Sequence, residues 1–176
     1  MRKLILILML GIFVSFPFPA SAQSSATLSS VIVQLWPEYD QPSMLVIVDF
    51  QVAASTSLPV TLNFRIPLDA NLIAVAADTG GGQFVNSPYD EPTIAGEYQT
   101  FNMVIEDNLP HRFEYYQPLS FNSDERTFSY LWDNGYAVEN FKYLFLEPLD
   151  VTSSSLDPNF TAQEAFSGLN YYEGPA

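Results

Sequence analysis

The stretch from Val31 to Pro67 constrains the fold most, because it contains three apolar runs separated by proline-containing breaks. One face of the second run, from Met44 to Val52, is wholly apolar, and in the third run apolar and polar residues alternate throughout. Alternation with a period of two is typical of a half-buried antiparallel strand. The apolar faces of both runs are therefore predicted to form the middle of a β-sandwich. Their core-facing residues are Met44, Val46, Val48, Phe50 and Val52 in the second run and Val60, Leu62, Phe64 and Ile66 in the third.

Strand-like segments recur along the rest of the chain, with proline, glycine or asparagine between them. The expected strands are residues 28–36, 44–52, 60–66, 71–77, 83–85, 97–105, 111–116, 126–132 and 136–146, with 87–96 as a loop and 133–135 (Asp-Asn-Gly) as a hairpin turn. After Pro148 the signal is weaker, with one more possible strand at 169–172. The sequence predicts an all-β fold, an antiparallel β-sandwich, and leaves Ig-like and jelly-roll-like variants open.

Residues 1–22 have the composition of a secretory signal peptide. Arg2 and Lys3 precede an apolar segment at 4–14, and Ala20-Ser21-Ala22 supplies the small residues of a cleavage site. That apolar segment is shorter than the roughly 20 residues a transmembrane helix needs, so no membrane anchor is expected in the mature chain. Residues 23–176 suit a single domain, expected to be secreted or in the cell envelope. Because the last strand-like segment ends close to Ala176, a piece of a longer architecture is an alternative.

The charge balance excludes several classes of partner. Removal of Arg2 and Lys3 would leave four basic residues against 20 acidic ones, a net charge of about −16. A field of this sign repels phosphate groups, so neither nucleic acid nor an anionic membrane surface is an expected partner. The absence of cysteine excludes disulfides, thiol nucleophiles and thiolate metal sites.

Little in the sequence points to catalysis, and we expect a protein that is not an enzyme. The single histidine, His111, lies at a strand start without a Gly-x-Ser-x-Gly motif in the chain, and we expect it to be exposed at a strand edge. Two carboxyl groups about 5 to 10 Å apart would suit a glycoside hydrolase, which is the alternative function. The candidate pairs are Glu38 with Asp40, Asp90 with Glu91, Glu106 with Asp107, and Asp124 with Glu125.

Several loops could bind ions, although none has a specific motif. Calcium prefers oxygen ligands, and the candidate ligands are Asp90 with Glu91, or Asp69 with Asn71; no other cofactor is expected. The run at 78–82, Asp-Thr-Gly-Gly-Gly, is similar to a phosphate-binding loop. It lacks the Lys-Ser/Thr pair and the helix that should follow, so a glycine-rich β-turn is predicted.

Aromatic residues next to turns are the remaining candidates for a binding site, because Trp and Tyr side chains stack on sugar rings and anchor protein contacts. The first turn presents Trp36, Glu38, Tyr39 and Asp40 together on a proline-stiffened loop, and Trp132 is a further candidate. The other aromatic residues in this group are Tyr89, Tyr98, Tyr115, Tyr116, Tyr130, Tyr136, Tyr171 and Tyr172. The competing explanation for all of them is packing in the core and at its rim.

The run Leu35-Trp36-Pro37-Glu38-Tyr39-Asp40, followed by Pro42 and Leu45-Val46-Ile47, resembles a pattern in uncharacterised secreted or envelope proteins of bacteria. The segments 64–67 and 114–116 are similar to parts of the same group. The resemblance implies a β-sandwich module and brings no activity and no functional residues. We therefore expect a secreted, non-enzymatic binding or structural module at the bacterial surface or envelope, with a protein or a glycan as its partner.

Overall fold

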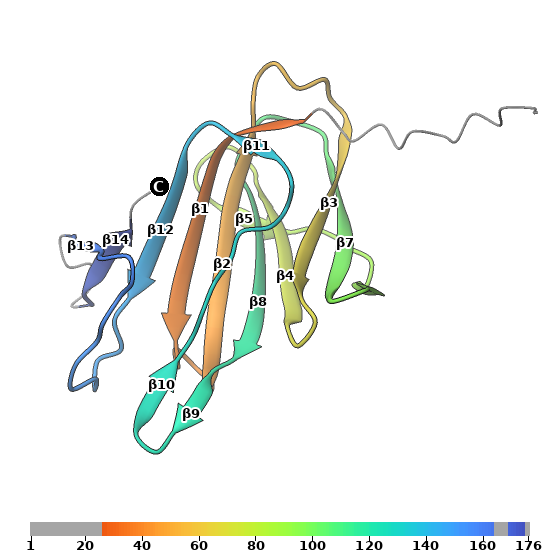
Figure 1. Cartoon of the computed structure of the whole chain (residues 1–176). Helices are drawn as coiled ribbons and strands as arrows, with labels where there is room; N and C mark the ends of the chain where they lie inside the picture. The colour runs from red at the N-terminus through yellow and green to blue at the C-terminus, as the bar shows by residue number, and fades with distance from the viewer. Residues whose placement is uncertain (1–25, 164–168, 175–176) are drawn as a thin grey trace, which may run out of the picture.

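The computed structural model describes residues 26–163 and 169–174, and these residues form strands, turns and loops without a helix (Figure 1). The strands belong to two layers that enclose one hydrophobic core, which confirms the prediction of an all-β sandwich. Within the described part of the chain, no helix is long and apolar enough to cross a membrane.

A hairpin of two long strands, β1 (Thr27–Pro37) and β2 (Ser43–Val52), forms the middle of the larger sheet. The predicted core face of β2 is confirmed, since Val46 and Val48 are fully buried. On the opposite face of β2, Leu45 and Ile47 are buried as well. Both faces of this strand are therefore covered near its start, which explains why the run is apolar at nearly every position.

The larger sheet continues from this hairpin in both directions, and its central strands follow one another across Figure 1. Its order is β13 (Thr161–Ala162), β14 (Tyr171–Gly174), β12 (Phe141–Leu146), β1, β2, β8 (His111–Pro118), β4 (Asn71–Asp78) and β5 (Phe84–Asn86), and β11 (Ala137–Val138) also pairs with β1. The sheet is antiparallel except where β1 pairs with β11 and β12, which run parallel to it. The predicted antiparallel β-sandwich is confirmed, with parallel pairing where β1 meets these two strands.

The smaller sheet has the order β3 (Val60–Pro67), β7 (Tyr98–Ile105) and β6 (Thr93–Ala95), the last within a segment predicted to be loop. Its inward side chains pack on the larger sheet: the ring of Phe64 lies 4.8 Å from that of Phe50 and 4.9 Å from that of Phe113. Phe101 packs on Phe113 at 5.2 Å. Burying each of these side chains contributes about 1.5–3 kcal/mol, so this aromatic cluster is the main contact between the layers.

The predicted strand at 126–132 is wrong for most of its length. Only Arg126 and Thr127 belong to a strand, β10 (Glu125–Thr127), which pairs with β9 (Ser120–Asn122) in a small hairpin at the bottom of Figure 1. The predicted hairpin turn at 133–135 is also wrong, because the segments on either side of it do not pair with each other. Gly135 has a φ of 69°, but the chain continues past it to β11, which pairs with β1.

Residues 128–136, here called the strap, run in an extended conformation beside the free edge of β3. Alternate side chains of the strap pack on the core, namely Phe128, Tyr130, Trp132 and Tyr136, while Leu131 between them is 81% exposed. Side chains rather than backbone groups hold the strap: the Tyr136 hydroxyl accepts from the N–H of Asn63 (2.8 Å) and donates to its carbonyl (3.1 Å). The Asn134 side chain accepts from the N–H of Arg65. The alternation of residues in this segment thus predicted correctly that one face of an extended chain is buried. It did not predict that the segment stays outside the hydrogen-bonded sheets.

Candidate functional site

The acids of the predicted binding loop have partners within the protein. Glu38, Tyr39 and Asp40 lie in the turn between β1 and β2, where the carboxylate of Glu38 is 3.2 Å from the guanidinium of Arg126 in β10. Both carboxylate oxygens of Asp40 lie 2.7 Å from the hydroxyl of Tyr116, which donates to them. These contacts connect the first hairpin to β8 and to the β9–β10 hairpin. They give both acids a structural role within the protein.

The aromatic residues of the same loop form a small cluster. Trp36 packs edge to face on Tyr39 at 4.9 Å and on Tyr171 at 6.5 Å, and Tyr39 is 57% exposed. Trp132 is not part of this cluster. It packs on Phe141 at 5.8 Å, against the inner face of the larger sheet, whereas Trp36 lies on the outer face. The structure therefore does not bring the two tryptophans together.

The loops that were considered as ion-binding sites differ in how their acidic side chains are placed. Asp90 and Glu91 are exposed between β5 and β6, and the described residues contain no group of three or more His, Cys, Asp or Glu side chains placed to hold a metal. In the glycine-rich turn, the N–H groups of Gly80, Gly81 and Gly82 all donate to the carboxylate of Asp78 at 2.8–3.2 Å. That carboxylate occupies the position that a bound anion would take.

His111 is buried, so the expectation of an exposed histidine at a strand edge is wrong. Its side chain is 5% exposed and stacks on Phe50 at 5.6 Å. Its Nδ1 lies 2.8 Å from the carbonyl oxygen of Leu109, and because a carbonyl only accepts, Nδ1 carries the proton. These contacts assign His111 to the packing of the core.

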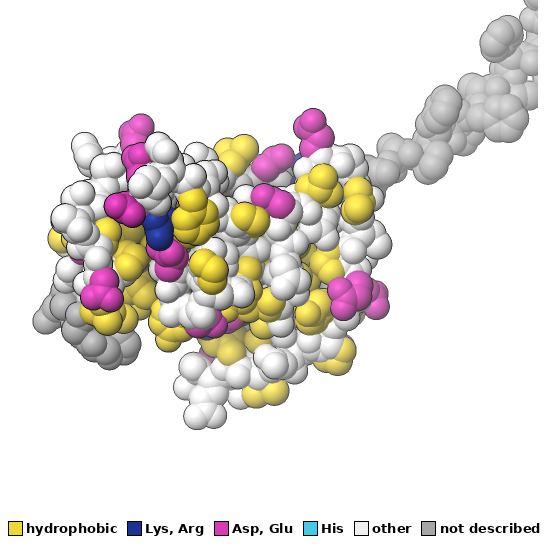
Figure 2. All heavy atoms as spheres, turned by 90° about the horizontal axis from the view of Figure 1, so that it is seen from below, with side chains coloured by type: hydrophobic (Ala, Val, Ile, Leu, Met, Phe, Trp, Pro, Cys, Tyr) yellow, Lys and Arg dark blue, Asp and Glu magenta, His cyan; other side chains and the backbone are white. Residues whose placement is uncertain are grey.

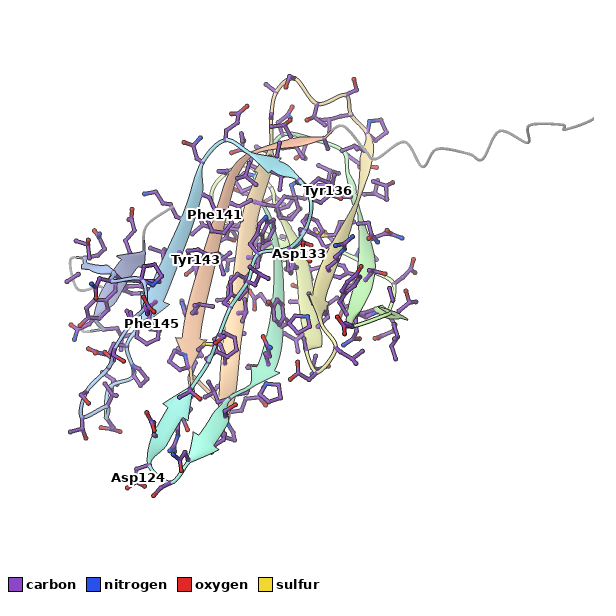
Figure 3. The ribbon with its side chains drawn as sticks, viewed as in Figure 1. Asp124, Asp133, Tyr136, Phe141, Tyr143 and Phe145 are labelled. Carbon is purple, nitrogen blue, oxygen red and sulfur yellow. The ribbon has the colours of Figure 1, made fainter. Side chains whose placement is uncertain are left out.

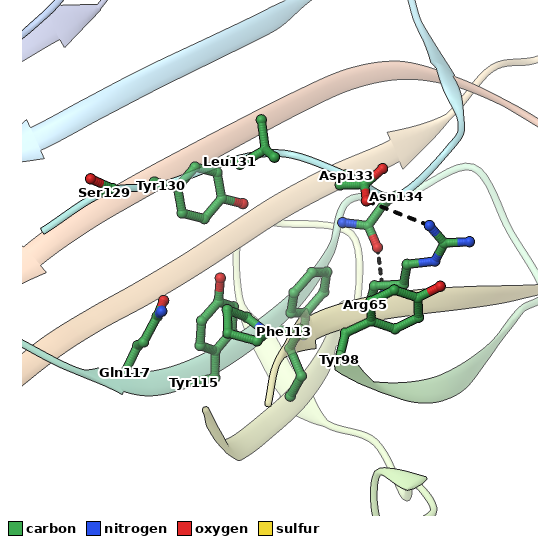
Figure 4. Close-up of a pocket in the computed structure, with 12 residues that line it drawn as sticks. Arg65, Tyr98, Phe113, Tyr115, Gln117, Ser129, Tyr130, Leu131, Asp133 and Asn134 are labelled. Atoms are coloured by element: carbon green, nitrogen blue, oxygen red, sulfur yellow. Dashed lines mark hydrogen bonds and ion pairs between the residues drawn. The ribbon is translucent and has the colours of Figure 1, made fainter. Parts of the chain in front are cut away.

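A cavity of about 230 Å³ lies between the strap, the end of β3 and the inner face of β8, and we call it the strap pocket (Figure 4). Four separate segments of the chain contribute to its walls. The lining residues are Arg65, Ile66, Pro67, Tyr98, Phe113, Tyr115, Gln117, Ser129, Tyr130, Leu131, Asp133 and Asn134.

Tyr115, which is buried, and Tyr130, which is partly buried, form the inner wall of the strap pocket. Tyr115 is 3% exposed, and burial raises the pKa of its hydroxyl well above the ordinary value of 10. Burial also raises the pKa of the Tyr130 hydroxyl, and the neighbouring Tyr115 and Tyr143 raise it further. Both phenols therefore stay neutral, and each can donate and accept a hydrogen bond.

The other end of the strap pocket is polar. The guanidinium of Arg65 lies 4.6 Å above the ring of Tyr98 and 3.6 Å from the carboxylate of Asp133. Figure 4 shows this group on one side of the pocket and Tyr115, Tyr130 and Gln117 on the other. The pocket thus combines aromatic faces with hydroxyl, amide, guanidinium and carboxylate groups, a set that can stack on a ring and hydrogen-bond to its substituents.

The sequence did not predict the strap pocket as a site. Tyr98, Tyr115 and Tyr130 stood among the aromatic residues near turns, but nothing in the sequence linked them to Arg65 or Gln117. No protein-family model matches the chain, and a search of curated proteins finds no match. The fold and the pocket therefore define a structural class of protein. It is a two-layer β-sandwich with a tyrosine-lined cavity at one sheet edge.

Proposed function

We propose that this protein is a secreted or envelope-associated, non-enzymatic binding module and that it binds a glycan in the strap pocket. The expected signal peptide at 1–22 supports a location outside the cytoplasm. The resemblance of the first hairpin to secreted bacterial β-sandwich proteins supports the same location.

The composition of the pocket is the observation that carries this proposal. Tyr98 and Tyr130, which are partly buried, offer aromatic surface, while Gln117 and Asn134 offer amide groups that donate and accept. A sugar ring needs both kinds of contact, because it has apolar C–H faces and hydroxyl groups around its edge. At about 230 Å³ the cavity is smaller than the roughly 300–1,000 Å³ of typical ligand pockets, which favours a single sugar ring over a larger ligand.

The carboxyl groups support a binding module over the alternative, a glycoside hydrolase. A general acid in such an enzyme needs a raised pKa. Among the described carboxyl groups, the pKa is shifted for Asp78 and Glu147, and in both it lies below the ordinary value. For Glu147 the causes are hydrogen bonds from Ser154 and Asn170. In Figure 2, which views the end with the β9–β10 hairpin, acidic side chains are scattered over the surface. Asp124 lies at the tip of that hairpin and Asp133 on the strap, well apart in Figure 3.

A glycan array, paired with a pull-down of envelope proteins, tests the proposal on the purified protein with and without calcium. We expect retention of at least one glycan. Tyr98→Ala should weaken its binding about tenfold, which corresponds to about 1.4 kcal/mol. Tyr39→Ala is the matched control, because Tyr39 is an exposed tyrosine at the originally predicted loop. The proposal fails if Tyr39→Ala abolishes binding and Tyr98→Ala does not, or if only proteins are captured.

A further inference from the structure

A second cavity of about 230 Å³ adjoins the strap pocket. It is lined by Asp69, Ser120, Thr127 and Phe128, among others, and it shares Gln117 and Ser129 with the strap pocket. Because two lining residues are common to both, the two cavities adjoin at the strap and β8. We call the two adjoining cavities together the groove.

The two halves of the groove differ in chemistry. The strap pocket is walled mainly by aromatic and apolar side chains. In the second cavity hydroxyl, amide and carboxylate groups predominate. Asp69 lines the second cavity, and its negative charge adds to burial in raising the pKa of the Tyr115 hydroxyl, which lines the strap pocket. One half can therefore stack on a ring, and the other can hydrogen-bond to a hydroxyl-rich group.

The charges that line the groove restrict its ligand. Asp69 and Asp133 line opposite halves, and Arg65 is the basic side chain among the residues lining both cavities. The guanidinium of Arg65 already lies 3.6 Å from Asp133. Asp69 is exposed, and no ion pair involving it is recorded among the described residues. An acidic sugar would place its carboxylate near this charge, at a cost, whereas a neutral sugar could donate hydroxyl hydrogens to it.

We propose that the groove provides two consecutive subsites for a neutral, unbranched glycan and that Asp69 determines its specificity. This inference rests on the proposed function of the strap pocket. One sugar ring stacks in the tyrosine-lined subsite. The next ring along the chain lies in the polar subsite, where a hydroxyl group donates to Asp69. The carboxylate at that position also disfavours chains of uronic acids.

Calorimetric titration with neutral gluco-, manno- and xylo-oligosaccharides of one to four units, and with galacturonate oligosaccharides of the same lengths, tests this inference. For the sugar that binds, we expect affinity to rise about tenfold from one unit to two, because the second subsite becomes filled, and little thereafter. Asp69→Asn should keep the one-unit affinity, lose most of that gain and bind galacturonate better relative to the neutral chain. Asp150→Asn makes the same change of charge at an exposed turn outside the groove, and should behave as the unmodified protein.

The possible results of this titration distinguish failure of the second subsite from failure of glycan binding in the strap pocket. If a single unit binds but a second unit adds nothing, or if Asp69→Asn matches Asp150→Asn, the second subsite is refuted while the strap pocket stands. If no oligosaccharide of any length binds, the proposed function fails and this inference fails with it.

Discussion

The carboxylate of Asp78 is held by the glycine turn that follows it. Burial raises its pKa, but hydrogen bonds from the backbone N–H groups of Gly80, Gly82, Gly81 and Gln83 outweigh this, and the pKa ends below its ordinary value of 3.8. A carboxyl group with a lowered pKa in the folded state stabilises the protein above its unfolded pKa. That contribution is lost as the pH falls through the lower, folded value.

Substitution of Asp78→Asn should therefore lower the midpoint of thermal unfolding at pH 7. The difference from the unmodified protein should shrink as the pH falls from about 4, the unfolded value, through the lower pKa at which Asp78 becomes protonated in the folded protein. Differential scanning calorimetry across this range measures the effect, with Asp150→Asn as a control for the loss of one negative charge. Equal midpoints for Asp78→Asn and the control at pH 7 would show that the turn does not depend on this carboxylate.

Tyr116 provides a second test at the level of one residue. Burial, the hydrogen bond to Asp40 and the negative charge of Asp40 raise the pKa of Tyr116 to about 12. A raised pKa means that the contribution to stability is complete below the unfolded value of 10 and is lost as the pH rises towards 12. In an ultraviolet titration of tyrosinate, Tyr116→Phe should remove one late-titrating phenol. Removal of a phenol that titrates near 10 would contradict the Asp40 contact.

Roles that depend on which side of a strand a residue faces could be predicted from the sequence, and roles that depend on distant partners could not. The core face of β2 is confirmed because alternation reports the direction of each side chain. His111 was expected to be exposed, yet Phe50 and Leu109 cover it. The ion pair between Glu38 and Arg126 joins residues 88 positions apart, and no local pattern reveals such a pairing.

At the level of elements, the strap protects the free edge of β3. An unpaired strand edge exposes backbone donors and acceptors that can recruit another chain. Here the side chains of Asn134 and Tyr136 satisfy backbone groups of Arg65 and Asn63. The strap also forms one wall of the strap pocket, so the same contacts that close the edge shape the candidate site.

Removal of the Tyr136 hydroxyl tests the attachment of the strap. Tyr136→Phe should lower the free energy of unfolding by about 0.5–1.5 kcal/mol, because the exposed N–H and carbonyl of Asn63 exchange this partner for water. Denaturant unfolding measures this loss, and hydrogen exchange at Asn63 should become faster. Tyr89→Phe is the control, since Tyr89 packs against the core and its hydroxyl forms no hydrogen bond with residues 26–163 or 169–174. Unchanged exchange at Asn63 in Tyr136→Phe would indicate that the strap does not guard this edge.

The errors in the predicted elements have a common cause. The strap has the alternation of a strand and contains an Asn-Gly pair, so local rules predicted a strand and a hairpin turn. Both rules describe the conformation of a short segment. Whether the segment then pairs through its backbone depends on which edge lies beside it, and β3 is more than 60 residues away in the chain. The sandwich could therefore be predicted, but not the strap or the pocket beneath it.

For the molecule as a whole, the two layers rest on an aromatic core and carry an excess of negative charge. The expected mature chain has four basic residues against 20 acidic ones, and such an excess destabilises a compact state through self-repulsion. Surface ion pairs such as Lys142 with Glu173 offset this only slightly, because exposed pairs contribute about 0–1 kcal/mol.

Added salt should accordingly stabilise the protein. Between about 0.01 M and 0.15 M salt the Debye length falls from about 30 Å to about 8 Å, which screens repulsion between distant carboxylates more than it weakens close ion pairs. The midpoint of thermal unfolding at pH 7 should therefore rise with sodium chloride over this range. A fall would mean that the paired charges, such as Arg112 with Asp49 at 2.6 Å, outweigh the net repulsion.

The claim that the strap pocket binds a glycan is tested most directly by mapping amide chemical shifts in the presence of a glycan retained on the array. The predicted result is a set of shifted signals at Arg65, Tyr98, Gln117 and residues 129–131, 133 and 134, which line the pocket from separate segments of the chain. Shifts confined to residues 36–40 would assign binding to the first hairpin and contradict the account, as would the absence of any shift at saturating glycan.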